Sequence, residues 1–179
     1  LYHLLFRCSW ETVQTFAAEH KYLGAQTGMV SVLHTWGQNL SLHPHVHAIV
    51  PGGGLTPQGK WRMAKGKGKF LFPVKAMNQV FRGKCVAGLR QLRQAGKLSY
   101  LGGAAELSEE TAWRDLLHRL YRKSWVIYAK RPFAGPEQVI RYLGRYTHRI
   151  ALSNHRLRSI EGGRVTFSWK DYRQAAKKG

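Results

Sequence analysis

The first fifty residues change from a helical to a strand-like pattern of apolar side chains. Residues 1–20 space their apolar positions at roughly helical intervals, which predicts a helix. Residues 28–36 are rich in β-branched and aromatic side chains and end at Gly37, so they predict a strand. Residues 45–50 predict a second strand, which Pro51 and the glycines after it stop. The short connection between the two strands favours an antiparallel pair.

The rest of the chain predicts further helices, a short strand and a terminal hairpin. Ser108 is expected to cap one helix, and Pro136 stands at the favoured first position of another. The hairpin turns at Gly162 and Gly163, where glycine tolerates positive φ. With no internal repeat and no linker, we expect a single α+β domain over residues 1–179, with a mostly antiparallel sheet. The helices are expected at residues 74–95, 108–121 and 135–148, the strand at residues 125–128, and the hairpin strands at residues 156–160 and 164–169.

The charge of the chain is strongly one-sided. Its 179 residues include 29 Lys and Arg against 9 Asp and Glu, a formal net charge of +20. The 44% apolar and 12% aromatic residues exclude a disordered basic tail, because such tails lack the side chains that build a core. No carboxylate lies between Lys21 and Ala105, and a polyanion is the simplest partner for so much uncompensated charge. We therefore expect the protein to bind nucleic acid.

A short segment inside this carboxylate-free stretch alternates cations with glycine and one tryptophan. Such a segment suits a loop that follows a phosphate backbone, and the alternative is a solvated loop that aids solubility. Its candidate DNA contacts are Lys60, Arg62, Lys65, Lys67 and Lys69.

Cysteine use and hydropathy indicate the compartment. Cys8 and Cys85 form no CxxC pair, which excludes a disulfide framework and a cysteine-rich zinc finger. No apolar run approaches the roughly 18 residues of a membrane span, and the first residues lack the order of a signal peptide. We therefore expect a soluble, cytoplasmic protein without a membrane partner. Because neither Leu1 nor the end at Gly179 has the features of a natural terminus, we also expect the domain to be incomplete at both ends.

Three histidines lie close together in the run His43-Pro44-His45-Val46-His47. On a strand, residues i and i+2 point to the same side, so His45 and His47 present two imidazoles on one face. Val46 and the next apolar residues are then expected to face the core, and Pro44 indicates that the strand starts after it. Two adjacent neutral imidazoles favour a bound cation, whereas ordinary surface histidines and a structural zinc site are the alternatives.

An open metal site needs at least one further ligand. Gln38 is the first choice, because it follows the preceding strand and the return to His45 and His47 is short. The other candidates are His34, Asn39 and His43 nearby, with Glu137 as the long-range carboxylate.

A second group of chemistry-bearing residues falls on one predicted helix. Tyr142 and Tyr146 are four residues apart, so their side chains leave the same helix face with Cβ atoms roughly 6 Å apart. Arg141, Arg145 and Arg149 repeat with the same spacing and form a parallel stripe of cations. One interpretation is a pair of core tyrosines beside a solvated arginine face. The other is a pair of nucleophiles beside phosphate ligands, because a nearby cation or an activated phosphate offsets the weak nucleophilicity of a phenol.

Four blocks of the chain together resemble one known family. They are similar to the signature blocks of the two-tyrosine HUH transposases of bacterial insertion sequences, of the insertion-sequence-91 type, which move by a rolling-circle route. The resemblance covers most of the chain, and its motifs are specific in combination. The blocks are residues 33–40, 43–54, 135–149 and 165–172.

The resemblance implies that His45 and His47 are metal ligands for Mg²⁺ or Mn²⁺ and that Tyr142 and Tyr146 are the nucleophiles. It implies an antiparallel sheet that carries the histidines, with helices packed on it and the tyrosines on one of them. Enzymes of this kind bind single-stranded DNA at a transposon end, and a tyrosine attacks the backbone to leave a 5′-phosphotyrosine and a free 3′-hydroxyl. The second tyrosine serves the second strand transfer, to target DNA. The arginine stripe is expected to contact DNA.

The resemblance also implies a bacterial protein that associates with the nucleoid when it is bound to DNA. Members of the family usually carry a cysteine-rich, zinc-binding segment before this region and more chain on both sides.

Three other functions are compatible with the same residues. A replication initiator or conjugative relaxase would use the same chemistry, although the flanking blocks favour the transposase. A zinc-stabilised structural domain would unfold on chelation, and the missing cysteines disfavour it. A non-catalytic nucleic-acid-binding module would leave the histidines incidental and stack bases on Trp61, Phe70, Phe72 and Trp169.

Overall fold

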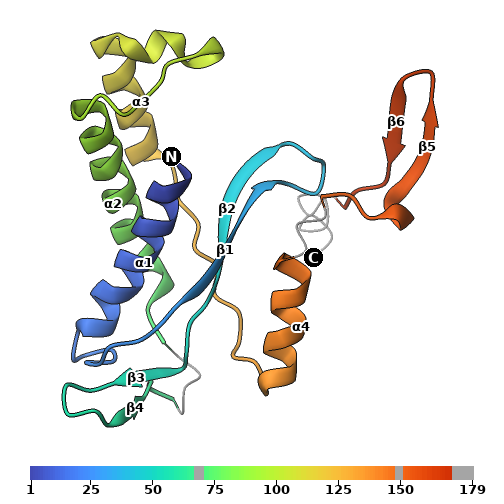
Figure 1. Ribbon diagram of the computed structural model, residues 1–179. Coiled ribbons are helices and arrows are strands. Elements are labelled where there is room, and N and C mark those ends of the chain that lie inside the picture. Colours follow the sequence, from blue (N-terminus) through green and yellow to red (C-terminus); the bar gives the residue numbers. More distant parts are fainter. Residues whose placement is uncertain (67–70, 148–150, 171–179) are drawn as a thin grey trace. The chain divides into compact units, whose positions relative to one another are not determined.

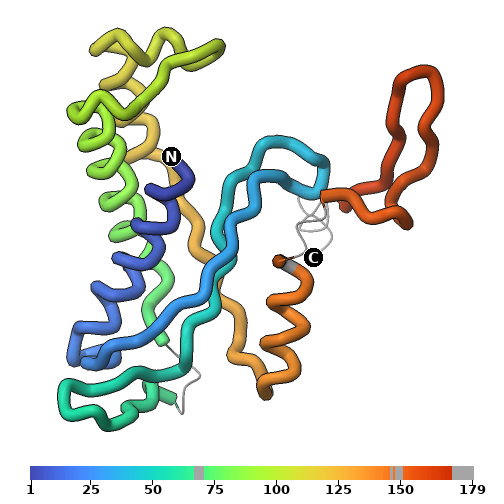
Figure 2. The backbone as a smooth tube through the Cα atoms, in the orientation of Figure 1, coloured from blue at the N-terminus to red at the C-terminus, as the bar shows by residue number. Residues whose placement is uncertain are grey.

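The computed structural model contains helices and strands in both halves of the chain, which confirms the predicted α+β class (Figure 1). Contacts between residues divide the chain into two compact units, and each is described by itself below. Figure 2 follows the backbone through both units. The structure describes residues 1–66, 71–147 and 151–170. The first unit comprises residues 1–30 and 48–132, and the second comprises residues 31–47 and 133–179.

Helices dominate the first unit, and each buries one stripe of side chains. On the first helix, the buried residues Leu4, Cys8, Thr12 and Phe16 repeat every four positions, so one face is turned to the core. The first helix packs against the second and the second against the third, which confirms the helices expected near residues 1–20 and 74–95. These elements are α1 (Tyr2–Ala18), α2 (Val74–Gln94), the short 3-10 helix η1 (Gly102–Ser108) and α3 (Glu110–Arg122).

Two of the apolar clusters that hold these helices together include Cys85 and Val86, neighbouring residues of α2. Cys8 of α1 and Cys85 of α2 are almost completely buried in one cluster with Leu4. A hydrogen bond with Cys8, together with burial, raises the pKa of the Cys85 thiol. The second cluster joins Val86 of α2, which has no exposed surface, to Trp113 and other apolar residues of α3. The α1–α2–α3 packing therefore uses two adjacent faces of α2.

A short antiparallel ribbon closes the other end of the first unit. It consists of β3 (Gly53–Leu55) and β4 (Trp61–Met63), with Gly54 opposite Arg62. A Cβ atom on Gly53 would lie 2.6 Å from the carbonyl oxygen of Arg62, and one on Gly54 would collide with the carbonyl oxygen of Gln26. Glycine is required here because two backbones approach too closely for any side chain.

The second unit is built from a strand pair, a helix and a terminal hairpin. The hairpin is antiparallel and turns at Gly162 and Gly163, whose φ values of +56° and +72° favour glycine, so the predicted hairpin is confirmed. The helix begins at Pro136, as predicted. The elements are β1 (Val30–Trp36), β2 (Leu42–Ile49), α4 (Pro136–Thr147), the 3-10 turn η2 (Asn154–Arg156), β5 (Leu157–Glu161) and β6 (Arg164–Phe167).

The strand predicted at residues 125–128 is wrong. The segment has no regular secondary structure, although its side chains still alternate between half-buried and exposed. The backbone N–H of Ile127 donates to Asn78 Oδ1 at 2.6 Å, and the Trp125 indole N–H donates to the carbonyl of Leu120 at 2.9 Å. The alternation therefore belongs to an extended segment held by hydrogen bonds to helical residues rather than by a neighbouring strand.

Two predicted boundaries are also wrong. β2 starts at Leu42 and includes Pro44, because each strand of a two-stranded ribbon has a free edge where a missing N–H is tolerated. Ser108 does not cap α3, which starts at Glu110. Ser108 instead ends η1, where its hydroxyl donates to the carbonyl of Ala105 at 2.7 Å.

The strands of the described residues form three separate two-stranded ribbons, where one larger sheet was expected. Two compact units can still belong to one domain, so the single domain stays a prediction. No helix in the described ranges combines the length and apolar character that crossing a membrane requires.

The two glycines of α2 provide a matched test of the α1–α2 packing. A Cβ atom on Gly83 meets nothing within 4 Å, whereas one on Gly88 collides with the Leu4 side chain of α1. We expect Gly83→Ala to stabilise the protein by about 0.5–1 kcal/mol, because alanine loses less backbone entropy in a helix. We expect Gly88→Ala to destabilise it by about 1–3 kcal/mol through overpacking.

Urea unfolding followed by circular dichroism would measure both free energies of unfolding. The two variants share the same helix and the same chemical change, so Gly83→Ala controls for helix propensity. Equal stabilisation by both substitutions would contradict the packing of Leu4 on Gly88.

Candidate metal centre and tyrosine helix

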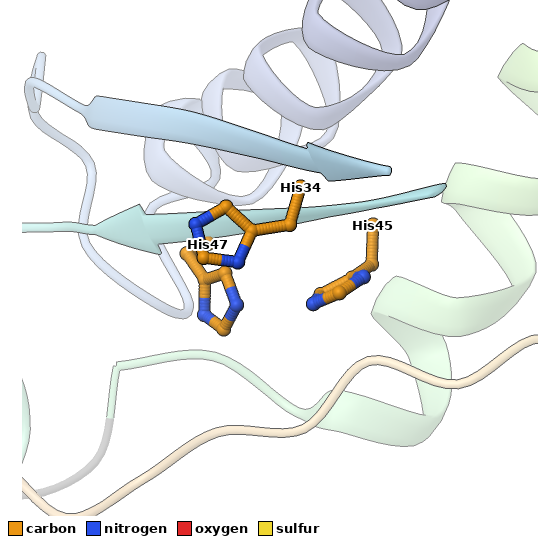
Figure 3. A group of neighbouring side chains, drawn as sticks. All are labelled: His34, His45 and His47. Carbon is orange, nitrogen blue, oxygen red and sulfur yellow. The ribbon is translucent and has the colours of Figure 1, made fainter. Parts of the chain in front are cut away.

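Three histidines from two neighbouring strands meet in the second unit. His34 lies on β1, and His45 and His47 lie on β2 (Figure 3). One potential ligand atom from each histidine lies within 4.8 Å of the others. The ring centroid of His34 lies 5.6 Å from that of His45 and 4.8 Å from that of His47. The centroids of His45 and His47 are 4.8 Å apart. This is a compact set of three imidazoles on one face of the ribbon.

The turn between β1 and β2 brings the three histidines together. The N–H of Gly37 donates to the carbonyl of Ser41 at 2.9 Å, and Leu40 takes a positive φ of 62°. The side-chain oxygen of Asn39 accepts from the N–H and the hydroxyl of Ser41 at 3.2 and 2.7 Å. The two strand arrows in Figure 3 run in opposite directions. Side chains two residues apart then share a face on both strands.

The local hydrogen bonds of His45 determine its tautomer. Its Nδ1 lies 2.7 Å from the carbonyl oxygen of His43. A carbonyl oxygen only accepts, so Nδ1 carries the proton and Nε2 keeps its lone pair. Burial lowers the pKa of His45, and the neighbouring His43 and His34 lower it further, against the opposing effect of the His43 carbonyl. At neutral pH, His45 is therefore an uncharged imidazole with Nε2 available to a cation.

The tyrosine helix reaches this cluster. The hydroxyl of Tyr142 on α4 lies 3.1 Å from His47 Nδ1, across a sequence separation of 95 residues. The ring of Phe133 lies 5.2 Å from the ring of Tyr142, centroid to centroid, at an interplanar angle of 57°. Two sequence blocks singled out separately, the histidine run and the tyrosine helix, thus form one site.

The structure gives less detail for the other predicted residues on and after α4. Tyr146 lies on α4 one turn after Tyr142, and Arg145 is exposed. Arg141 donates to Glu137 Oε1 at 2.7 Å in an exposed ion pair. Glu137, the long-range ligand candidate, is therefore paired within its own helix. Arg149 lies outside the described residues.

The structure brings His34, rather than Gln38, to the two predicted histidines. Gln38 is exposed in the turn after β1, and its carbonyl oxygen accepts from the Arg156 guanidinium. Gln38 as a ligand stays a prediction, and His34 was one of the other local candidates. The sequence feature that points to His34 is its position in the first predicted strand. When the second strand returns antiparallel, His45 and His47 lie opposite that part of the first strand.

The face of β2 opposite the histidines is buried less completely than expected, although Val50, which directly follows the strand, packs against an apolar core cluster. Val46 is half-buried and Ala48 is exposed. The expectation of a core-facing side therefore holds for Val50 and fails for Ala48.

The basic loop belongs to the first unit, and part of its charge forms hydrogen bonds within the fold. Lys60 and Lys65 are exposed, as a DNA contact requires. The guanidinium of Arg62 donates instead to the carbonyls of Leu23 and Gly24 at 3.3 and 2.9 Å. Lys67 and Lys69 lie outside the described residues.

Comparison with known proteins gives a consistent result. Residues 28–179 match the family model Y2_Tnp, which is described as "Putative transposase". The chain is 50% identical over 173 residues to "Putative transposase y4qJ" of Sinorhizobium fredii, an alignment that covers 97% of this chain and 43% of that protein. It is 29% identical over 176 residues to "Transposase for insertion sequence element IS801" of Pseudomonas savastanoi pv. phaseolicola, covering 96% of this chain and 40% of the relative.

The chain thus spans about two fifths of the length of these curated relatives. No solved structure matches it. Since the family model covers most of the chain, including every residue of the histidine cluster and the tyrosine helix, the chain belongs to the Y2_Tnp family of transposases.

Proposed function

We propose that this chain nicks single-stranded DNA and transfers the cut strand through a 5′-phosphotyrosine intermediate. The observation that carries the proposal is the 3.1 Å separation between the Tyr142 hydroxyl and His47, inside a cluster of three histidines. A phenol at that position is within reach of a phosphate that binds at the cluster. The family, together with relatives named as transposases, supports DNA at transposon ends and target sites as the substrate.

The residues present suit a divalent metal. His34, His45 and His47 would supply three imidazole nitrogen ligands to a divalent metal, which would take its further ligands from oxygen atoms. When bound, a divalent metal withdraws charge from a non-bridging oxygen and makes the phosphorus more electrophilic. Of the two expected metals, Mn²⁺ suits an all-imidazole set better than Mg²⁺, which prefers oxygen ligands.

Tyr142 is the nucleophile of the first step. Its hydroxyl oxygen attacks the scissile phosphorus as the bond from phosphorus to the 3′ oxygen breaks in line. The phenol loses its proton, and the departing 3′ oxygen gains one to become a free hydroxyl. Phe133 packs beside the Tyr142 ring and limits the directions in which the phenol can point.

Tyr146 is the nucleophile of the second step. It follows Tyr142 by one turn on α4, so a second strand end can be captured while the first stays covalently attached. Two nucleophiles one turn apart on the same helix would allow both strand ends to be held at once.

Cations near the tyrosines hold the neighbouring phosphates. Arg145 is exposed on α4, and Arg141 lies on the same helix in an ion pair with Glu137. Because the ion pair is exposed, it is weak and Arg141 can exchange the carboxylate for a phosphate.

The central test is covalent capture of DNA. The chain is incubated with Mn²⁺ and labelled single-stranded oligonucleotides that tile the ends of the element encoding it, and adducts are separated on a denaturing gel. We expect a metal-dependent adduct with the native chain and none with the Tyr142→Phe/Tyr146→Phe double variant. Tyr142→Phe alone is expected to reduce the first-turnover adduct by at least about 100-fold, since the nucleophile is lost.

Tyr128→Phe is the matched control, because Tyr128 is an exposed tyrosine of the first unit. An adduct that survives in the double variant would contradict tyrosine chemistry at these positions. An adduct that Tyr146→Phe abolishes and Tyr142→Phe leaves intact would reverse the order of the two steps.

The third ligand is tested by metal affinity. Losing a residue that hydrogen-bonds to a metal ligand typically weakens metal binding by about 10–100-fold. We expect His34→Ala to weaken Mn²⁺ binding by more than this, because the substitution removes a coordinating nitrogen. Gln38→Ala and His43→Ala are expected to change it by less than about threefold. Isothermal titration calorimetry measures the three dissociation constants, and a dominant effect of Gln38→Ala would assign the third position to that residue.

The role of Arg145 is tested by salt dependence. We expect Arg145→Gln to weaken binding of single-stranded DNA at every sequence and to reduce the slope of log K against log salt by about 0.7, the value for one phosphate contact. Fluorescence anisotropy at several salt concentrations measures the slope. Lys97→Gln removes an equal charge from an exposed site of the first unit and serves as the control. Identical slopes for the two variants would show that Arg145 contributes only general charge.

A further inference from the structure

The tryptophan at the end of β1 lies next to the histidine cluster. The rings of Trp36 and His34 are stacked, with centroids 5.6 Å apart and an interplanar angle of only 8°. Both side chains leave the same face of β1, because they are two residues apart on one strand. The ribbon face that carries the three histidines thus continues into an indole.

Trp36 has no place in the apolar cores of the described residues. Trp10, Trp113 and Trp125 each pack against one of the three core clusters. Trp61 and Trp169 are exposed in other parts of the fold. Trp36 is half-buried, and its ring contact is with the histidine cluster. A large aromatic side chain that is placed beside a reaction centre and outside the core is suited to hold a ligand.

The chemistry around Trp36 favours a nucleobase as this ligand. Stacking on an aromatic side chain is the common way in which proteins hold the bases of single strands, and it tolerates every base because each has a π face. The carboxylate-free stretch of the chain includes β1 and β2, so their sequence places no negative charge beside an approaching strand. The indole of Trp36 already stacks on the imidazole of His34, and a base that stacks on the indole would extend this row of flat rings.

We propose that Trp36 stacks on the nucleobase next to the scissile phosphate and so sets which phosphate enters the histidine cluster. The inference rests on the proposed function, because it takes the histidine cluster as the site of that phosphate. The 5.6 Å between the two ring centroids limits the stacked base to a nucleotide adjoining the phosphate. Bases in a duplex are already paired and stacked, so a stacking site at this position selects unpaired DNA.

The test combines protein variants with abasic DNA. Binding is measured by fluorescence anisotropy in the Tyr142→Phe/Tyr146→Phe background, so that no covalent adduct forms. Single abasic sites are moved one position at a time along a single-stranded oligonucleotide from an element end. We expect one abasic position to weaken binding by about 5- to 150-fold, the range for loss of one stacked base.

Trp36→Leu is expected to weaken binding of the intact oligonucleotide by the same factor and to make it insensitive to that one abasic position. Trp36→Phe, which keeps an aromatic face, is expected to restore most of the affinity and the sensitivity. Trp61→Leu removes an exposed tryptophan of the first unit and is the matched control. It should leave the pattern of abasic effects unchanged.

Two results would overturn the proposal. If Trp36→Leu and the abasic site together reduce the affinity by the product of their separate effects at every position, the indole and a base do not interact. If Trp36→Leu weakens Mn²⁺ binding as strongly as His34→Ala and shows no such coupling, Trp36 only positions His34.

The test is independent of the covalent capture experiment. Coupling at one abasic position without any adduct from the native chain would support the stacking site and reject the nicking chemistry. An adduct without coupling would support the chemistry and reject the stacking site.

Discussion

The site depends on the two-residue alternation of side chains along paired strands. His45 and His47 share a face because they are two residues apart on β2, and His34 joins them because β1 lies beside β2. No helix or loop of the described residues contributes a histidine to the cluster. The ribbon therefore sets the positions of all three imidazoles, and α4 brings the phenol of Tyr142 to them.

The all-imidazole composition of the cluster has an electrostatic meaning. Carboxylate ligands would cancel part of the charge of a bound cation, whereas neutral imidazoles leave it undiminished. In a chain with a net charge of +20, binding such a cation is costly unless an anion arrives with it. Under the proposed function, the basic surroundings and the imidazole ligands together would favour a state in which metal and phosphate are bound at the same time.

Much of the local structure could be predicted from the sequence, because helices and hairpins follow from short-range patterns. The helices α1, α2 and α4 and the hairpin with its two glycines lie close to their expected positions. The strand expected at residues 125–128 failed, because alternation indicates an extended backbone and says nothing of a partner strand. The pair His45 and His47 was evident from spacing alone, whereas the third histidine depends on pairing between strands, which spacing does not encode.

Side-chain roles were the hardest to predict, because they depend on contacts between distant residues. Arg62 stood in a basic loop and was expected to hold phosphate, yet its guanidinium binds the carbonyls of Leu23 and Gly24. The resemblance implied that the histidines and the tyrosines share a site, whereas the particular contact between Tyr142 and His47 became evident only in the structure. Motifs identify which residues carry chemistry, and the tertiary fold decides which of them meet.

The turn between β1 and β2 shows how the number of residues in a surface loop can be constrained. Exposed turns usually accept insertions and deletions. This turn is held by the Gly37–Ser41 hydrogen bond, by Leu40 at positive φ and by Arg156, which reaches its Gln38 carbonyl from the base of the terminal hairpin. One added residue that shifted the pairing would turn His45 and His47 to the other face of the ribbon, away from His34. In this chain, the identities of the amino acids in the turn are therefore less constrained than their number.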